Sequence, residues 1–268
     1  MRIATWNVNS VGARLPRLLP WLEERQPDVV ALQETKCADD AFPYAELAAR
    51  GYAALHVGEG RWNGVAVLSR VGLEVVSTGL GAYAEAHFAM ARCGGLTVAS
   101  VYVPNGRALG DPHYAYKLEW LAALRRTLDD WDPATPLAVM GDFNVAPSDD
   151  DVFDPRAFDG STHVTEPERA AVRALVDWGL SDVRARTDPL PSRPGHPRPG
   201  HPFTYWDYRA GMFHKDLGMR IDLVLLSRAL TVRDAVVDRH ARRGKGTSDH
   251  APVVVDLADP ADVTGPAA

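Results

Sequence analysis

Hydrophobic residues recur along this chain with two different spacings, and these predict two kinds of element. Three segments carry apolar residues mostly three or four positions apart: Leu15, Leu18, Leu19 and Leu22; Leu118, Leu121, Leu124 and Leu128; and Val172, Leu175 and Val176. This spacing gathers apolar side chains on one face of an amphipathic helix. Short apolar runs that are typical of buried strands lie at Ile3–Val8, Val29–Leu32, Gly64–Leu68, Leu73–Ser77, Thr97–Val103, Leu137–Met140, Ile221–Leu226, Thr231–Val237 and Pro252–Leu257.

The strand-like and helix-like segments alternate without a repeat or a shift in composition, which indicates a layered α/β fold. We therefore expect one domain over residues 1–257 and an irregular tail over 258–268. The Pro-rich stretch 189–202 predicts an extended surface loop. Its two histidines, His196 and His201, stand in a repeated Gly-His-Pro and are not expected to bind metal.

The composition and net charge of the chain do not decide its function. The chain has 268 residues, of which 46% are hydrophobic, and a formal net charge of −6. A basic face can coexist with a negative total, so this charge neither supports nor excludes a nucleic-acid partner. Lysine is scarce beside arginine, so contacts to phosphate should come mostly from arginine.

The two cysteines and the N-terminus favour a cytoplasmic protein. Cys37 and Cys93 are far apart and form no CxxC pair, which is typical of reduced, buried thiols. The first residues carry no basic stretch followed by an apolar one, as a secretory signal would. No run approaches the roughly 18 apolar residues that cross a bilayer, so no membrane association is expected.

Polar residues stand where several of the apolar runs begin or end. They are Asn7, Glu34, Tyr102, Asn105, Asp142, Asn144, Asp222, Asp249 and His250. One carboxylate at a strand end is commonly a turn or a helix cap. A set of such ends is better explained by a ligand site, because these sites gather at strand ends in α/β sheets.

The residue types in this set favour a hard divalent cation. Carboxylates that share a site repel one another unless a cation or a proton relieves them. Glu34, Asp142 and Asp249, with Asn7 and Asn144, offer only oxygen ligands, which suit magnesium or manganese better than zinc. His250 has Asp222 as a candidate partner, which would favour a charged imidazolium able to stabilise a phosphate.

In chain order these segments resemble the exonuclease III family of abasic-site endonucleases, within the endonuclease/exonuclease/phosphatase superfamily. The matching segments are TWNVNS (5–10), PDVVALQETK (27–36), WNGVAVLSR (62–70), YVPNG (102–106), GDFN (141–144), TYWDY (204–208), GMRID (218–222) and SDHAPV (248–253). The resemblance implies a four-layer α/β sandwich, with two mixed β-sheets flanked by helices and the site at one edge. It also implies a monomer.

The same resemblance implies a reaction and a role for each residue. The reaction is hydrolysis of double-stranded DNA on the 5′ side of an abasic sugar, with 3′-5′ exonuclease and 3′-phosphatase activity at blocked ends. Magnesium is the implied cofactor, and manganese can substitute. The implied metal ligands are Glu34, Asn7 and Asp249, and Asp142 with Asn144 could form a second site. Asp142, oriented by Asn144, would transfer the proton; Tyr102 and Asn105 would hold the phosphate; and His250 with Asp222 would stabilise it.

Recognition of the abasic sugar should need an apolar pocket. The positions that match the family are Tyr205 or Trp206, Met219 and Ile221. Arg107 and the loop 209–215 are candidate wedges into the DNA grooves, and they are equally well explained as solvated loop charges.

One departure from the family pattern concerns a contact to the DNA phosphates. The family usually has arginine where this chain has His87, after Glu85 and Ala86. An always-charged phosphate contact would become one that is mostly neutral above about pH 6.5. Arg92 is a candidate replacement.

Two other interpretations remain open. The first is another phosphodiesterase of the superfamily, such as a pancreatic-type deoxyribonuclease, a sphingomyelinase or an inositol-polyphosphate phosphatase. The first two of these place a second catalytic histidine where this chain has Tyr102, so Tyr102 favours the repair branch. The second is a DNA-binding relative with weakened catalysis. The presence of Glu34, Asp142 and His250 argues against it.

Overall fold

The computed structural model describes residues 1–187 and 202–258. The predicted loop 189–202, except for Pro202, therefore lies outside the described residues, and so does the predicted tail beyond Ala258.

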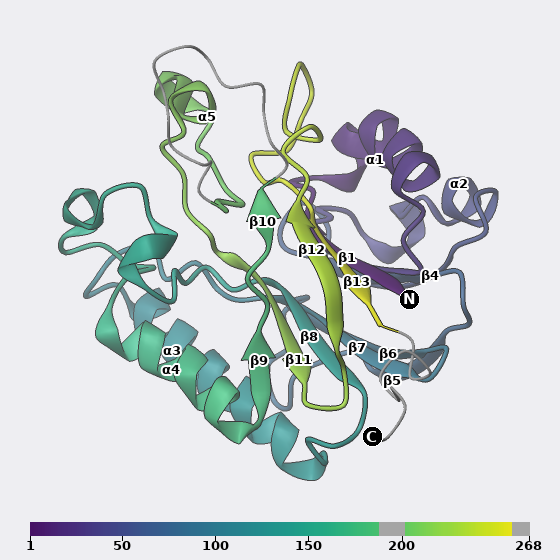
Figure 1. Ribbon diagram of the computed structural model, residues 1–268, viewed down its shortest axis with the longest axis horizontal. Helices are drawn as coiled ribbons and strands as arrows, with labels where there is room; N and C mark the ends of the chain where they lie inside the picture. Colours follow the sequence, from purple (N-terminus) through teal and green to yellow (C-terminus); the bar gives the residue numbers. More distant parts are fainter. Residues whose placement is uncertain (188–201, 259–268) are drawn as a thin grey trace, which may run out of the picture.

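The strands form two mixed sheets that pack face to face (Figure 1). The seven-stranded sheet has the order β10 (Arg186–Thr187), β12 (Val232–Val237), β13 (Val253–Leu257), β1 (Arg2–Asn7), β2 (Val29–Gln33), β4 (Val65–Ser69) and β3 (Ala53–Val57). The six-stranded sheet has the order β5 (Glu74–Ser77), β6 (Phe88–Cys93), β7 (Leu96–Tyr102), β8 (Leu137–Asp142), β11 (Asp222–Ser227) and β9 (Leu180–Asp182). The pairs β1–β2 and β7–β8 are parallel and lie inside their sheets.

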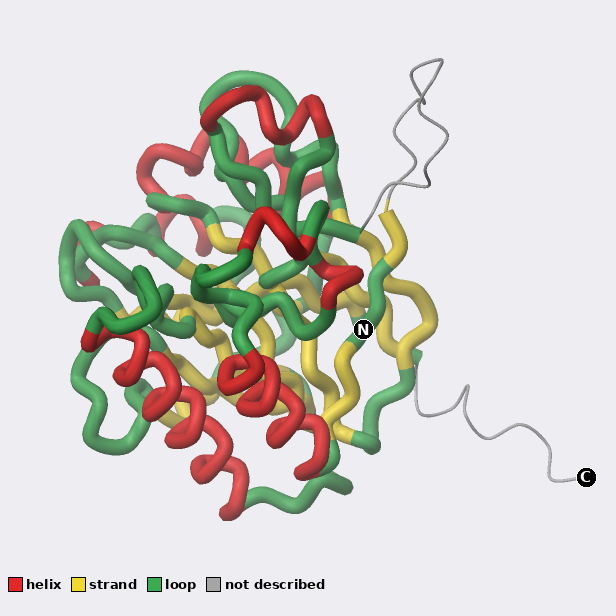
Figure 2. The backbone as a smooth tube through the Cα atoms, turned by 90° about the vertical axis from the view of Figure 1, so that its left-hand side faces the viewer, coloured by secondary structure: helices red, strands yellow, loops and turns green. Residues whose placement is uncertain are grey.

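Helices cover the outer face of each sheet. The seven-stranded sheet packs against α1 (Val11–Arg25) and α2 (Tyr44–Ala48) through one apolar cluster. The six-stranded sheet packs against α3 (Pro112–Thr127) and α4 (Glu166–Trp178) through another, and these two long helices lie side by side (Figure 2). A third cluster fills the space between the sheets. The four-layer sandwich expected from the sequence is confirmed.

Short helical turns complete the described elements. They are α5 (Met212–Lys215) and the 3₁₀ turns Asp39–Ala41, Leu128–Asp130, Asp149–Asp151, Pro155–Phe158 and Arg209–Gly211. The segment 209–215, expected to be a loop, is therefore partly helical, with a kink at Ala210 where φ is 54°. Among the described residues, no helix is long and apolar enough to cross a membrane.

The apolar spacing located the three long helices and nine of the strands, but it missed β3, β6 and the short strands β9 and β10. Strand β6 carries alanine and methionine, which have little preference for strands. It forms a strand because β5 and β7 pair with it on both sides. Tertiary pairing thus overrides the local preference of this segment.

A chain of buried hydrogen bonds ties the two sheets together near the ends of β1, β2 and β7. The hydroxyl of Thr5 donates to Gln33 Oε1 at 3.2 Å, and Gln33 Nε2 donates across the sandwich to Ser100 Oγ at 3.1 Å. Ser100 Oγ in turn donates to the carbonyl of Leu32 at 3.0 Å. These bonds fix the position of one sheet relative to the other directly beside the polar strand ends.

Candidate active site

The polar strand ends meet because parallel neighbours finish at the same edge of a sheet. Asn7 pairs with Gln33, the residue before Glu34, and Tyr102 pairs with Asp142. Asp222 begins the antiparallel strand β11 directly opposite Asp142. The packing of the two sheets then brings both groups of ends together.

Asn7 links the two central carboxylates. Its amide nitrogen donates to Glu34 Oε1 at 2.7 Å and to Asp142 Oδ2 at 2.9 Å. The backbone N–H of Asn9 donates to Asn7 Oδ1 at 3.0 Å and so fixes the orientation of the amide. In this geometry Asn7 holds the carboxylates in place through its NH₂ group, and its predicted role as a metal ligand stays a prediction.

Lys36 is a site residue that the sequence did not reveal as such. Its ammonium lies 2.7 Å from Glu34 Oε2 and donates to Asn9 Oδ1. Burial opposes the ionisation of Glu34, but Lys36 and the Asn7 amide outweigh it and lower the pKa of Glu34. Glu34 and Lys36 both have a φ of 51°, which turns them toward the same site. Only the position of Lys36, two residues after Glu34, hinted at this role.

His250 is paired with Asp222, as the sequence predicted. The imidazole Nδ1 lies 2.8 Å from Asp222 Oδ2, and Nε2 lies 3.8 Å from Asp142 Oδ2. Burial opposes a charge on the ring, but Asp222, Asp142 and Asp249 together outweigh it and raise the pKa of His250 to about 10. The histidine is therefore an imidazolium at neutral pH.

Asp142 has the electrostatic character of a group that exchanges a proton. Its side chain is buried, with 1% of the residue exposed. Burial, together with Asp222 and Glu34, raises its pKa to about 7 against the lowering effect of His250. The backbone N–H of Asn144, whose φ is 50°, donates to Asp142 Oδ1 at 2.8 Å and orients the carboxylate.

Tyr102 and Asn105 present hydrogen-bond donors beside the carboxylates. Burial, and then the charges of Glu34 and Asp142, raise the pKa of Tyr102 well above its ordinary value, so the phenol keeps its proton. The exposed Asn105 donates from Nδ2 to Asn144 Oδ1 at 3.2 Å. Tyr102 is the last residue of β7, and Asn105 belongs to the segment that follows it.

The donor set fits a hard divalent cation. Ligand atoms of Glu34, Asp142 and His250 lie within 4.8 Å of one another, and they form the one such group found in the described parts of the chain. The two carboxylates offer oxygen, whereas the charged His250 offers an N–H and is better suited to an anionic oxygen. Asp249, an expected ligand, lies outside this group and accepts a hydrogen bond from Asn9 Nδ2 at 2.9 Å.

The residues predicted to line a pocket lie near His250. The ring of Tyr205 lies 4.9 Å from the His250 ring, and Tyr205 packs on the small apolar cluster that contains Met219 and Ile221. Trp206, the alternative to Tyr205, is wholly buried and donates to Asp216 Oδ1 at 3.2 Å. Of the two aromatics, Tyr205 borders the site, and Trp206 belongs to the core.

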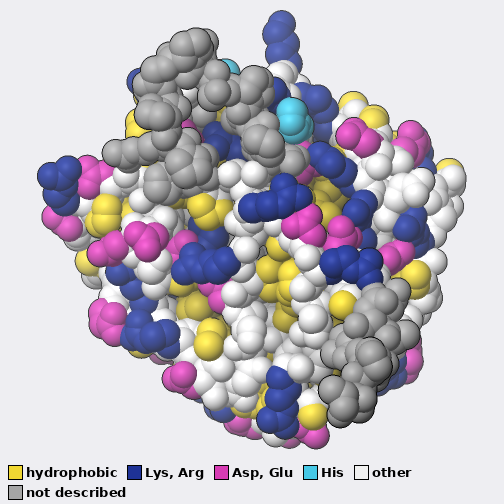
Figure 3. Space-filling model, viewed as in Figure 1, with side chains coloured by type: hydrophobic (Ala, Val, Ile, Leu, Met, Phe, Trp, Pro, Cys, Tyr) yellow, Lys and Arg dark blue, Asp and Glu magenta, His cyan; other side chains and the backbone are white. Residues whose placement is uncertain are grey.

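The candidate wedges lie on exposed segments. Arg107 is exposed, and its backbone N–H donates to Asn105 Oδ1 at 3.1 Å, which places it next to the phosphate-binding candidate. Arg209 is exposed and forms an ion pair with Asp207 at 2.5 Å. On the face shown in Figure 3, basic and acidic side chains are interspersed and form no continuous basic stripe.

His87 does not offer a charged contact to phosphate. Only 6% of it is exposed, and its ring stacks on Tyr102 with centroids 5.1 Å apart. Burial lowers its pKa, so the ring is neutral at neutral pH. Arg92 is not a replacement, because it lies at the far end of β6 and pairs with Glu74 at 2.8 Å.

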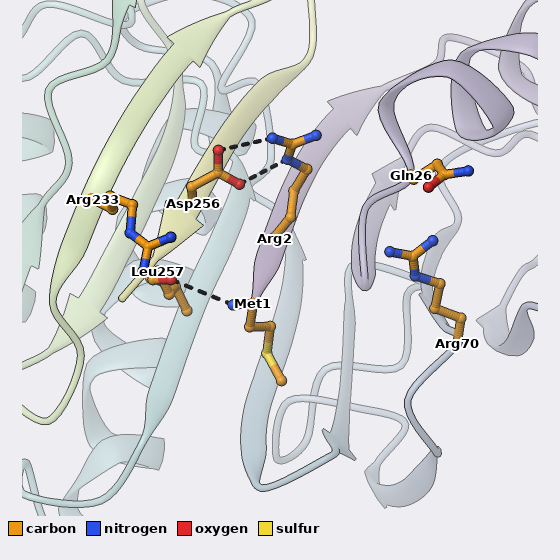
Figure 4. Close-up of a pocket in the computed structure, with 7 residues that line it drawn as sticks. All are labelled: Met1, Arg2, Gln26, Arg70, Arg233, Asp256 and Leu257. Atoms are coloured by element: carbon orange, nitrogen blue, oxygen red, sulfur yellow. Dashed lines mark hydrogen bonds and ion pairs between the residues drawn. The ribbon is translucent and has the colours of Figure 1, made fainter. Parts of the chain in front are cut away.

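A separate surface hollow lies at the other end of the seven-stranded sheet. It has a volume of about 310 Å³ and is lined by the start of β1 and the end of β13, including Arg2, Asp256 and Leu257 (Figure 4). Arg2 forms an ion pair with Asp256 at 2.7 Å. Asn7 ends the strand that Arg2 begins, so this hollow is distinct from the carboxylate site.

Comparisons with known proteins agree with this geometry. The family described as Endonuclease/Exonuclease/phosphatase matches residues 4–250. The exodeoxyribonuclease III of Haemophilus influenzae is 32% identical, over 94% of this chain and 98% of the relative. An AP endonuclease from Archaeoglobus fulgidus has a similar structure, with a TM-score of 0.89 and 32% identity over 97% of this chain and 100% of that chain. A 3′-5′ exonuclease from Neisseria meningitidis has a TM-score of 0.88 and 37% identity over the same shares.

Proposed function

Because the chain belongs to the endonuclease/exonuclease/phosphatase family and is a hydrolase of the exonuclease III type, we propose that it is a magnesium-dependent DNA phosphodiesterase of base excision repair. It would cleave 5′ to abasic sites and trim 3′ ends as a 3′-5′ exonuclease and 3′-phosphatase. The observation that carries this proposal is the group of the half-buried Glu34 and the buried Asp142 and His250, in which Asn7 bridges the two carboxylates. We further propose that it acts in the cytoplasm as a monomer.

Glu34 and Asp142 are the residues that would hold magnesium, with Asp249 beside them. When bound, the ion supplies a Lewis acid that polarises a phosphate oxygen and lowers the pKa of water. Burial raises the pKa of Asp142, and the charges of Asp222 and Glu34 add to it; a bound cation would offset this repulsion.

The chain's own residues then supply donors and a proton-transfer group. Asp142, oriented by the N–H of Asn144, can accept a proton from water or return one to the leaving oxygen. The imidazolium of His250 and the phenol of Tyr102 both carry protons at neutral pH and can donate to the phosphate. Preorganised donors of this kind stabilise the charge that develops in the transition state.

The neighbouring apolar surface supports a substrate that lacks a base. The half-buried Tyr205 lies against the His250 ring and packs on the buried Met219 and Ile221, so its ring offers an apolar face where a flipped abasic sugar could rest. Flipping costs less where no base is stacked, which gives selectivity without reading a base. A solved structure similar to this chain, a Neisseria 3′ phosphatase, is bound to a product DNA hairpin, which supports double-stranded DNA as the substrate here.

Three labelled duplexes would test the proposal: one with a single abasic analogue, one with a 3′-phosphate, and one with an intact recessed 3′ end. Each is incubated with the protein in magnesium or in EDTA. We expect incision on the 5′ side of the analogue, release of phosphate and stepwise shortening, each in magnesium only. Uncut DNA in magnesium, or equal cutting in EDTA, would overturn the proposal.

A further inference from the structure

The helix α3 carries a lysine where its pattern calls for an apolar residue. Lys117 lies on the same face as Leu121 and Leu124, and it is wholly buried. A buried ammonium is costly unless it is paired and hydrogen-bonded. Its carboxylate partner, Glu168 on α4, is also wholly buried, and Lys117 Nζ lies 2.5 Å from Glu168 Oε1.

The ammonium of Lys117 also bonds to both segments that carry candidate catalytic residues. It donates to the backbone carbonyl of Asn144 at 2.6 Å and to that of Asn105 at 3.3 Å. Asn144 follows β8, and Asn105 follows β7. The lysine stem passes under the second of these segments, where Gly106, with a φ of 85°, leaves room for it: a Cβ there would lie 3.1 Å from Lys117 Cδ.

Glu168 is held firmly enough to serve as an anchor for the lysine. It closes the capping box of α4 with Thr165, and its carboxylate also accepts from the Thr162 hydroxyl at 2.6 Å and the His163 N–H at 3.0 Å. The imidazole Nδ1 of His163 lies 2.6 Å from the carbonyl of Asn144, so it donates to the same oxygen that Lys117 binds. The two helices and both segments therefore converge on one charged group.

This convergence fixes the residue that orients Asp142. Asn144 has a φ of 50°, a conformation that costs energy outside glycine and persists where the surroundings impose it. Its carbonyl is held by Lys117, its side-chain amide donates to the Val103 carbonyl at 2.9 Å, and its N–H donates to Asp142. The carbonyl belongs to the peptide after Asn144 and the N–H to the peptide before it. Loss of the Lys117 contact would leave the carbonyl held by His163 alone, and it would act on the N–H by relaxing the φ and ψ of Asn144.

We propose that Lys117 is a positioning residue for the reaction, because its ammonium holds the backbone of Asn144 and Asn105 and thereby sets the orientation of Asp142 and of the phosphate-binding amide. The inference rests on the proposed function of this site. Lys117 does not touch the site carboxylates itself; it acts through the two backbone carbonyls.

A pair of variants separates positioning from stability. Glu168→Gln breaks the ion pair but keeps an oxygen that can accept from Lys117, so both carbonyl contacts survive. The double variant Lys117→Met/Glu168→Gln removes the contacts and leaves no unpaired buried charge, so it should fold, because buried ion pairs can often be replaced without loss of stability. Leu121→Ala, a buried change on the same helix, is the control for a loss of packing.

Single-turnover cleavage in magnesium and duplex affinity in EDTA are measured for each protein, with its melting temperature. We expect Glu168→Gln and Leu121→Ala to cleave within about fivefold of the wild type despite lower melting temperatures. The double variant should cleave about 100-fold more slowly, as a small misplacement of a catalytic group would cause, with its duplex affinity retained.

Two results would overturn this inference. One is a double variant that cleaves as fast as Glu168→Gln. The other is a set of rates that simply follows the melting temperatures, which is the pattern of a purely structural lysine. A wild-type protein that cuts none of the three duplexes would overturn the proposed function, and the inference with it.

Discussion

The pair of Asp222 and His250 allows the charge at the site to be changed without a change of shape. Asp222→Asn keeps the size of the side chain and an oxygen that can accept from His250 Nδ1, whose present distance to Asp222 Oδ2 is 2.8 Å. The variant removes one buried negative charge. Burial would then act on the imidazolium with less opposition, and the pKa of His250 should fall toward its ordinary value of 6.5.

The size of the effect follows from the pKa of His250. The difference between 6.5 and about 10 corresponds to on the order of 5 kcal/mol in favour of the charged ring. Asp222 is the largest of the three carboxylate contributions. If it supplies somewhat more than half, about 3 kcal/mol, the ratio of charged to neutral ring falls about 100-fold at any given pH. The rate of the variant should then fall about tenfold for each pH unit above its lowered pKa, and it approaches a 100-fold loss only as the pH nears the pKa of the wild type.

The assay is single-turnover cleavage of the 3′-phosphate duplex in magnesium across a series of pH values. The wild type should keep its rate from neutral to mildly alkaline pH, because His250 stays protonated up to its raised pKa. Asp222→Asn should lose rate as the pH rises above neutrality and should recover part of it on acidification. Asp234→Asn, at an exposed ion pair with Arg186, is the matched control and should behave as the wild type.

The His250→Gln variant completes the comparison, because adding Asp222→Asn to it should cost little more. The reasoning would be refuted if Asp222→Asn kept both the rate and the pH profile of the wild type. It would also be refuted if the two changes reduced the rate independently, since Asp222 would then act by a route other than the histidine.

Three further predictions concern the metal, its anchor and the acid stability. Glu34→Gln should lower the rate of cleavage at least about 100-fold, because a charged metal ligand is lost. Its affinity for duplex DNA in EDTA should stay within a few-fold of that of the wild type. An unchanged rate in a gel assay would show that Glu34 is not the main metal ligand. Magnesium should raise the melting temperature of the wild type, measured by calorimetry, more than that of Glu34→Gln, because a ligand that binds only the folded protein stabilises it. An equal rise in both proteins would show that the ion binds elsewhere. The buried neutral His87 has a lowered pKa, so the unfolded chain binds the extra proton and stability falls as pH drops below about 6.5. His87→Gln should therefore weaken this acid dependence of the melting temperature, and an unchanged slope would contradict the role given to burial.

The strand ends could be predicted from the sequence because they depend on local order. A run of apolar residues followed by Glu34 or Asp142 marks both a strand and the point where it stops. Parallel pairing then brings such ends to one edge, which is a general property of these sheets. The pairing of Asp222 with His250 followed from the same logic and is present at 2.8 Å.

Long-range features were beyond the reach of the sequence. Nothing local shows that the Asn7 amide turns its nitrogen to the carboxylates, since this depends on the backbone of Asn9. The burial of His87 depends on its stacking against Tyr102, which lies on the neighbouring strand. Lys117 could have been suspected, because it interrupts an apolar helical face, but its partner Glu168 is 51 residues away.

The buried bonds from Thr5 through Gln33 to Ser100 bear on how the enzyme would lose its activity. They cross from one sheet to the other directly beside the site, so neither sheet can slide without breaking them. We therefore expect the site to lose its geometry only when the two sheets come apart, and not by local unfolding of the strand ends alone. In increasing urea, cleavage should fail at the same concentration as the fold, and the amide protons of these strand ends should exchange with solvent only through global unfolding.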